Sequence, residues 1–204
     1  MARVPTEVRR RQLIDAAMTV IAREGVDGAT TRKIADEARA PLATLHYCFQ
    51  NKENLLWAVF EHLAELVRND LAQANGSDPA ATALVSRLLR ETVQWAIENP
   101  APNRAQIEIW LWARRNDPEF ALRIYDMFIE TWKGCLRQGL TPLPEEHLET
   151  LTRVFVAVID GLCLQLITHG DQLAVLREAE TAREMLMAYI VPPGAAAAAV
   201  CPGA

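Results

Sequence analysis

The sequence predicts an all-α protein of about nine helices. Apolar residues recur at helical spacing along almost the whole chain, and β-branched residues never alternate with polar ones over a useful length. Gly, Pro and Asn interrupt the periodic stretches at intervals typical of helix ends. With 204 residues, of which 50% are hydrophobic and 23% charged, the chain can bury a core without a metal or disulfide framework.

The N-terminal part predicts three helices. The first spans residues 6–25 and ends on a glycine suited to a left-handed C-terminal cap. Thr30 or Thr31 can cap a short second helix, because a hydroxyl oxygen accepts hydrogen bonds from the free amides of the first turn. Pro41 lies where a third helix begins, since proline is tolerated in a first turn, and this helix ends near Phe49.

Six longer helices follow in the remaining chain. Asn51 caps the first of them, and Asn or Asp next to proline marks two other boundaries. The predicted ranges are 52–74, 84–97, 103–115, 118–138, 145–168 and 171–189. The helix over 103–115 is apolar on several sides, so we expect it to be buried on more than one face. Residues 192–204 carry no charge and no amphipathic pattern, which predicts a disordered tail.

Charge is distributed unevenly along the chain. The net charge is -5, but residues 1–52 hold nine Lys/Arg against six Asp/Glu, whereas residues 53–204 hold twelve against twenty. A basic segment joined to an acidic body is expected if only the first segment faces phosphates. By charge alone, chance clustering on solvated faces stays an open alternative.

Residues 30–49 have the pattern of a helix-turn-helix, with two short helices, a tight turn and small residues where helices approach. Ile34, Ala35, Ala38, Leu45 and Phe49 would lock the pair, so the other side of the second helix can enter a major groove. Hydroxyls, amides and cations at the helix starts can meet phosphates. The candidate DNA-contacting residues are Thr30, Thr31, Arg32, Pro41, Leu42, Ala43, Thr44, His46, Tyr47 and Lys52.

The segments TTRKIADEA and TLHYCFQNKENLL resemble the TetR family of transcriptional regulators. The resemblance is strong over residues 8 to about 60 and extends to the rest in helix number and length. Three positions depart from the family's usual pattern: Arg39 replaces glycine in the turn, Pro41 replaces serine, and His46 stands at the first of the usual aromatic positions. A left-handed turn at Arg39 would be strained, and the operator sequence cannot be taken from a relative.

A dimer is expected, because helix-turn-helix proteins read two half-sites about one helical turn apart or a multiple of it. The segments 145–168 and 171–189 hold more apolar surface than one protomer is expected to bury, and Gly161 would allow close approach. Pairing through these two C-terminal helices would form a four-helix bundle in a homodimer, as the resemblance also implies. The alternative is that these helices are only the core of the monomer. The predicted domains are therefore 1–52 for DNA binding, 53–191 for effector binding and dimerisation, and the tail 192–204.

The resemblance implies a small-molecule effector pocket in the middle helices. Four of the five tryptophans lie between residues 95 and 132, and aromatic walls with a few polar groups are usual in such sites. The candidate ligand-binding residues are Trp95, Asn103, Glu108, Trp110, Trp112, Phe128 and Trp132. Carboxylates beside tryptophan faces would suit a cationic ligand. Each tryptophan can also be read simply as part of the core.

The sequence predicts a ligand-responsive DNA-binding regulator, a repressor by resemblance, that binds a palindromic double-stranded operator and is released by its effector. No catalytic motif, cofactor motif or metal-ligand spacing is found, and irregular cysteine spacing predicts reduced thiols. No long uninterrupted apolar run and no N-terminal signal are found, so we expect no membrane partner and a cytoplasmic location. The alternatives are a helical enzyme that binds small molecules, or an interaction module without sequence-specific DNA binding.

Overall fold

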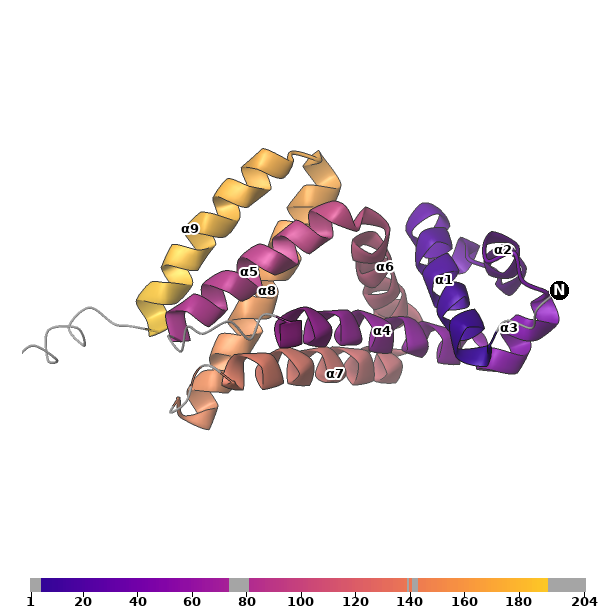
Figure 1. The fold of residues 1–204 in the computed structure, drawn as a ribbon, viewed down its shortest axis with the longest axis horizontal. Coiled ribbons are helices and arrows are strands. Elements are labelled where there is room, and N and C mark those ends of the chain that lie inside the picture. The colour runs from indigo at the N-terminus through magenta and orange to yellow at the C-terminus, as the bar shows by residue number, and fades with distance from the viewer. Residues whose placement is uncertain (1–4, 74–80, 139, 141–142, 191–204) are drawn as a thin grey trace, which may run out of the picture. The chain divides into compact units, whose positions relative to one another are not determined.

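The computed structural model describes residues 5–73, 81–138, 140 and 143–190. Within these ranges the chain forms nine helices, so the predicted fold class is confirmed (Figure 1). They are α1 (Thr6–Gly28), α2 (Thr31–Glu37), α3 (Leu42–Phe49), α4 (Lys52–Gln73), α5 (Ala81–Glu98), α6 (Pro100–Asn116), α7 (Pro118–Arg137), α8 (Glu145–His169) and α9 (Gln172–Ile190). The predicted tail, residues 192–204, lies outside the described residues.

The helices form two compact units that differ from the predicted division at residue 52. The first unit comprises residues 1–72 and 99–131, which contain α1–α4, α6 and most of α7. The second comprises residues 73–98 and 132–204, which contain α5, the end of α7, α8 and α9. These units reflect packing rather than role, so the boundary between the DNA-binding and effector-binding parts stays a prediction.

The core of the first unit forms around α1. Its apolar stripe, with Leu13, Ala17 and Val20 at helical spacing, is fully buried. α2, α3 and α6 all pack on α1. In α2 and α3 the buried residues are Ile34, Ala35, Leu45 and Phe49, while Ala38 is half-buried. The two short helices are therefore fixed by tertiary packing, since helices this short are not stable alone.

Side-chain caps fix several helix starts where the sequence predicts them. The Thr30 hydroxyl accepts from the Lys33 amide at the start of α2, and the Asn51 side-chain oxygen accepts from the Asn54 amide at the start of α4. Asp117 accepts from the Phe120 amide and Asp171 from the Ala174 amide. Each cap pairs an amide that lacks an intrahelical partner.

Three predicted helix boundaries need correction, and one of them is the start of α5, which lies at Ala81 rather than at residue 84. Gly25 breaks the first helix with φ 71° and ψ 170°, but one further turn follows and α1 extends to Gly28. This extra turn places Val26 in the core. α6 begins at Pro100, three residues before the predicted start, because prolines need no amide partner in a first helical turn.

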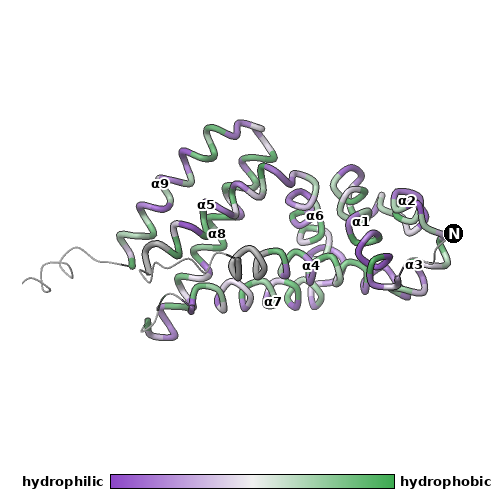
Figure 2. Tube along the Cα trace, in the orientation of Figure 1, coloured by the Kyte–Doolittle hydropathy of each residue, from purple (hydrophilic) through white to green (hydrophobic). Residues whose placement is uncertain are grey.

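In the second unit α5 packs against α9, and both pack against α8. Hydrophobic residues recur along all three helices (Figure 2). Trp132, at the end of α7, meets Phe155 of α8 edge-on with 5.2 Å between ring centroids. Among the described residues, α8 is the one helix long and apolar enough to cross a bilayer by length and composition alone, a property that core helices share. The sequence search counted only uninterrupted apolar residues, so it did not single out this helix as long and apolar. Less than half of the most apolar stretch of α8 is buried.

Candidate nucleic-acid interface and effector site

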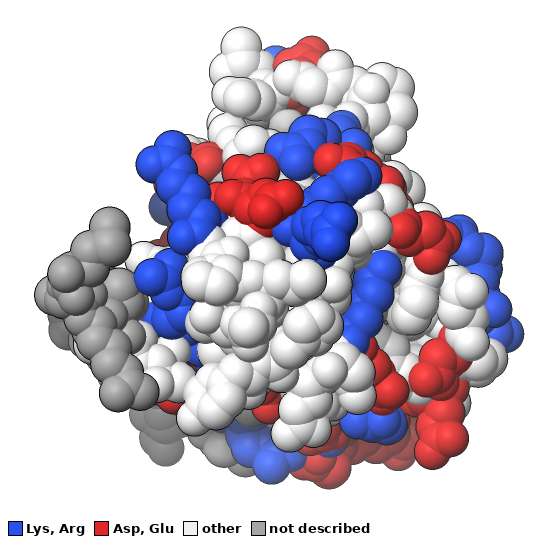
Figure 3. All heavy atoms as spheres, turned by 90° about the vertical axis from the view of Figure 1, so that its right-hand side faces the viewer, with Lys and Arg blue, Asp and Glu red and all other residues white. Residues whose placement is uncertain are grey.

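One side of α3 is turned outward. Leu45 and Phe49 are buried, and the exposed residues between and before them are Pro41, Ala43, His46 and Tyr47. Tyr47 is 77% exposed, an unusual degree of exposure for so large an aromatic residue. Leu42 and Thr44 are half-buried. Figure 3 looks onto the face that carries α1–α3; uncharged side chains cover much of its middle, with both basic and acidic side chains around them.

The start of α2 adds groups that suit phosphate oxygens. Thr30 and Arg32 are exposed and Thr31 is half-buried. The Thr30 hydroxyl oxygen already accepts from the Lys33 amide, so its O–H stays available as a donor. Arg32 has no ion-pair partner among the described residues. The predicted contact set from Thr30 to Tyr47 is thus brought together on the first unit, on two helices and the turn between them.

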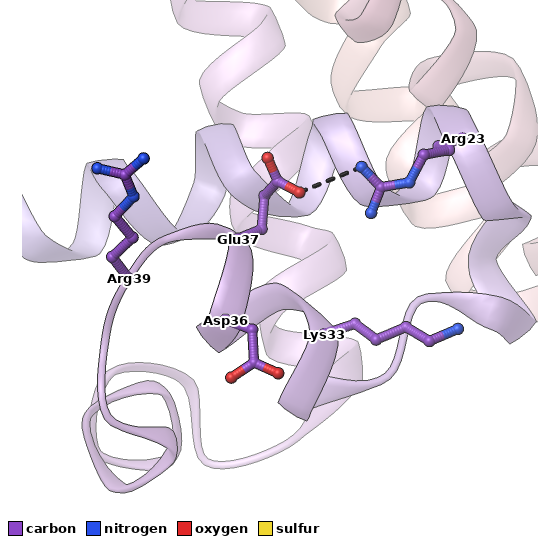
Figure 4. Close-up of a pocket in the computed structure, with 5 residues that line it drawn as sticks. All are labelled: Arg23, Lys33, Asp36, Glu37 and Arg39. Atoms are coloured by element: carbon purple, nitrogen blue, oxygen red, sulfur yellow. Dashed lines mark hydrogen bonds and ion pairs between the residues drawn. The ribbon is translucent and has the colours of Figure 1, made fainter.

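The turn between α2 and α3 adopts the strained conformation expected from the sequence, because Arg39 has φ 48°. Arg39 also borders a surface hollow of about 420 Å³ together with Arg23, Lys33, Asp36 and Glu37 (Figure 4). Arg23 pairs with Glu37 at 3.1 Å, and Lys33 pairs with Glu24. Lys33 extends away from Arg39 and does not converge with it. The hollow is therefore lined by largely paired charges and offers no focused anion site.

Lys52 differs from the other predicted DNA contacts. It is half-buried, and its Nζ donates a hydrogen bond to the Val26 carbonyl oxygen at the end of α1. Burial lowers the pKa of the Lys52 ammonium, and the Asp27 carboxylate partly opposes this shift. In this structure Lys52 ties the start of α4 to the end of α1.

Trp112 makes a second tie at the end of α1. Its indole Nε1 donates to the Asp27 carboxylate at 2.6 Å, which joins α6 to α1. Glu108, one turn earlier on α6, approaches Gly25, where an added Cβ would lie 3.7 Å from the Glu108 carboxylate. These two candidate ligand-binding residues thus lie at the contact between α6 and the DNA-binding helices.

Trp110, unlike Trp112, lies at the centre of an aromatic cluster. Phe60 of α4 lies 5.7 Å from its ring centroid, Tyr125 of α7 6.4 Å and Phe128 of α7 5.3 Å. Asn103, one of the predicted polar contacts, is 96% buried on the same helix as Trp110. Trp95 and Trp132 belong to the second unit, so the seven candidates divide between the two units.

Sequence reasoning missed several residues of these sites. Phe60, Tyr125 and Asp27 are not among the candidate site residues that the sequence predicts. The period of α4 and α7 placed Phe60 and Tyr125 on inward faces, but no local signal says which aromatic they meet. Asp160 was also missed: burial on α8 raises its pKa to about 7.

A short helix that exposes one side and packs with its other side on two neighbouring helices, next to a larger helical part, is typical of a helix-turn-helix DNA-binding regulator. The model described as "Bacterial regulatory proteins, tetR family" matches residues 13–59. The nicotine-responsive transcriptional repressor HdnoR of Paenarthrobacter nicotinovorans is 43% identical over 169 residues, which cover 80% of this chain and 86% of that protein. The transcriptional regulator BetI of Rhizobium meliloti (strain 1021) is 29% identical, covering 78% of this chain and 77% of BetI.

Solved structures agree. A TetR-family member from Streptomyces coelicolor A3 has a TM-score of 0.69 at 27% identity, covering 90% of this chain and 98% of that one. The multidrug binding protein EbrR, complexed with imidazole, has a TM-score of 0.64 at 28% identity and 92% coverage of both chains. The chain belongs to the tetR family of bacterial regulatory proteins. It is a DNA-binding transcriptional regulator rather than an enzyme.

Proposed function

We propose that two copies of this chain bind a palindromic operator in the cytoplasm and leave it when a small nitrogen-containing aromatic or cationic effector binds. The exposed side of α3 is the observation that carries this proposal. Its fixed buried residues hold the helix while Tyr47 and His46 stay free to meet base edges or phosphates. Thr30, Thr31 and Arg32 would contact the phosphates beside that groove, and Pro41, Leu42, Ala43 and Thr44 its bases.

Lys52 has a less direct role in this proposal. Its ammonium is held by the Val26 carbonyl, so it acts on DNA mainly by fixing the position of α4 against α1. Its positive charge still adds to the field of the DNA-binding face.

Pairing of protomers would use the outer sides of α8 and α9. Within the two segments predicted for this interface, Val154 and Tyr189 are exposed, whereas several apolar residues are buried within the protomer: Leu151, Phe155, Ile159, Leu162 and Leu186. Leu164 and Met185 are 53% and 71% exposed and extend the same apolar surface. An added Cβ at Gly161 would meet nothing within 4 Å, so the backbone there is open to a partner. Exposed apolar surface of this kind is typical of protein interfaces.

The effector class follows from relatives and from the aromatic cluster. HdnoR is named as nicotine-responsive, and EbrR was solved with imidazole and with ethidium. Trp110, Phe128 and Asn103 would contact the effector in the first unit. Trp95 and Trp132 belong to the second unit and stay predictions from the sequence. Aromatic faces suit flat or cationic molecules.

Release would proceed by a population shift. The effector acts only if it binds the non-DNA-binding conformation more tightly than the DNA-binding one. Trp112 and Glu108 lie on the same helix as Trp110 but face the end of α1, so a shift of α6 would move the helices that carry the recognition surface.

Fluorescence anisotropy with an operator selected from random duplexes tests the DNA-binding part. Tyr47→Ala is expected to weaken binding about 10- to 100-fold with an unchanged thermal midpoint, because it removes an exposed contact. Arg115→Ala, an exposed change at the end of α6, serves as the control. Equal affinity of Tyr47→Ala and the wild type, or a selected site without two-fold symmetry, would contradict the proposal.

A further inference from the structure

We propose that the effector is recognised by an uncharged hydrogen-bond acceptor on a flat ring system, such as a ring nitrogen or a carbonyl oxygen, that accepts from the Trp110 indole. The inference rests on the proposed effector site and names the ligand chemistry that this site selects. Asn103 supplies the second polar contact.

Trp110 has a buried donor with nothing to bond. Its Nε1 is shielded from solvent and has no hydrogen-bond partner among the described residues. The Nδ2 of Asn103, a residue only 4% exposed, is in the same situation. A buried polar group without a partner costs free energy, and folded proteins rarely keep one without a reason. An indole can only donate, so the missing partner of Trp110 must be an acceptor.

The two unpaired donors lie on one side of α6. Asn103 and Trp110 are seven residues apart, which is about two helical turns, so their side chains share a face. Trp112 lies about 200° around the same helix, and its indole donor is paired with Asp27. The contrast between the two indoles shows that α6 carries a structural face and a face with unpaired polar groups.

The surroundings of Trp110 set the shape of the ligand. Phe60, Tyr125 and Phe128 place their rings 5.3–6.4 Å from it, in tilted or edge-on orientations. Rings in such arrangements bind a flat molecule through stacked and edge contacts.

The surrounding charges set the charge of the acceptor. No Lys or Arg among the described residues is buried, and Arg123, the cation over the neighbouring Trp57 ring, pairs with Glu53. A carboxylate ligand would therefore lose its hydration without gaining a buried cation, which is costly. A neutral acceptor loses much less hydration free energy on burial, and hydrogen bonds from the unpaired donors compensate for that loss.

Quinoline and naphthalene test this inference as a matched pair, because they have nearly the same shape and only quinoline has a ring nitrogen. Equilibrium dialysis with the full chain is expected to show quinoline binding about five- to tenfold more tightly, the equivalent of one hydrogen bond. Trp110→Phe keeps an aromatic ring without the donor and is expected to abolish this preference. Trp57→Phe, in the neighbouring ring pair, is the control and is expected to keep it.

Asn103→Leu provides a second variant that does not depend on a tryptophan. It removes the buried amide with little change of volume, so we expect a higher thermal midpoint and, because the single quinoline nitrogen bonds Trp110, an unchanged quinoline preference. A lower midpoint would mean that the amide is already paired within the fold.

The inference is overturned if wild type binds naphthalene as tightly as quinoline, if neither binds up to about 1 mM, on the order of weak fragment affinity, or if Trp110→Phe keeps the preference. Operator release is measured separately on the same proteins. Selective quinoline binding without release would sustain the ligand class and contradict the effector role, so the two proposals fail in different ways.

Discussion

The α2–α3 pair and the α8–α9 pair both expose one side, but the exposed side chains differ in kind. On α2 and α3 they include hydroxyl, imidazole, phenol and guanidinium groups, which can hydrogen-bond to DNA, together with the charged side chains of Lys33, Asp36 and Glu37. On α8 and α9 large apolar side chains, namely Val154, Leu164, Leu173, Met185 and Tyr189, are exposed beside charged residues such as Arg177 and Glu184. Both pairs follow the same helical periodicity, so periodicity alone does not tell the kinds of partner apart. The chemistry of the residues left outside the core does.

The largest effect is expected from placing a charge in the apolar surface. Leu164→Glu should produce a protomer of 22.7 kDa in sedimentation and lower operator affinity more than about 100-fold, because two linked half-site contacts become independent. The protomer should stay folded, since Leu164 is outside the core. His147→Glu, exposed in the first turn of α8, is the matched control. A dimer that persists in Leu164→Glu would remove the distinction between the two pairs.

A pH effect is expected next, from Asp160 in the second unit. Burial raises the pKa of Asp160 to about 7, whereas in the unfolded chain it titrates near 3.9. Between these values the folded state holds a proton that the unfolded state has lost, so stability falls as pH rises from about 4 to about 7. The loss amounts to at most about 4 kcal/mol.

Urea denaturation at pH 5 and pH 8 measures this loss. Asp160→Asn should remove most of the difference between the two pH values and be the more stable protein at pH 8. The same pH dependence in both proteins would show that Asp160 is solvated in the fold.

A smaller effect is expected at the contact between α6 and α1. A double-mutant cycle of Trp112→Phe and Asp27→Ala should give a coupling energy of about 1 kcal/mol, as for one hydrogen bond to a carboxylate in a partly exposed place. Additive effects on the free energy of unfolding would mean that the two side chains do not interact in solution. The pair of changes Trp57→Phe and Asp27→Ala should be additive.

The smallest effect concerns the strained turn. Arg39→Gly should stabilise the fold by about 0.5 kcal/mol, because glycine adopts positive φ without strain but is more flexible when unfolded. Gln50→Gly, at φ 61° after α3, should act in the same direction. A fall in the thermal midpoint of Arg39→Gly would show that the arginine side chain contributes more than its backbone costs.

The sequence was sufficient for the fold class, the helix-turn-helix and most helix starts, because caps such as Thr30, Asn51 and Asp117 act within a few residues. It was insufficient wherever two distant segments meet. Trp110 and Trp112 look alike in sequence, yet one faces an aromatic cluster and the other bonds Asp27. Lys52 likewise read as a phosphate contact because its bond to Val26 spans 26 residues. In α8, likewise, the sequence does not tell that Leu162 is buried and Leu164 is exposed, because that depends on which helices pack against α8.

Only Leu45 and Phe49 of the eight residues in α3 belong to the core. The exposed positions Ala43, His46 and Tyr47 can therefore be randomised together at little cost in stability, and the variants screened for new DNA targets. Because such changes leave α6 and its aromatic neighbours unaltered, libraries of this kind would yield regulators that respond to the same small molecule but act at a different promoter.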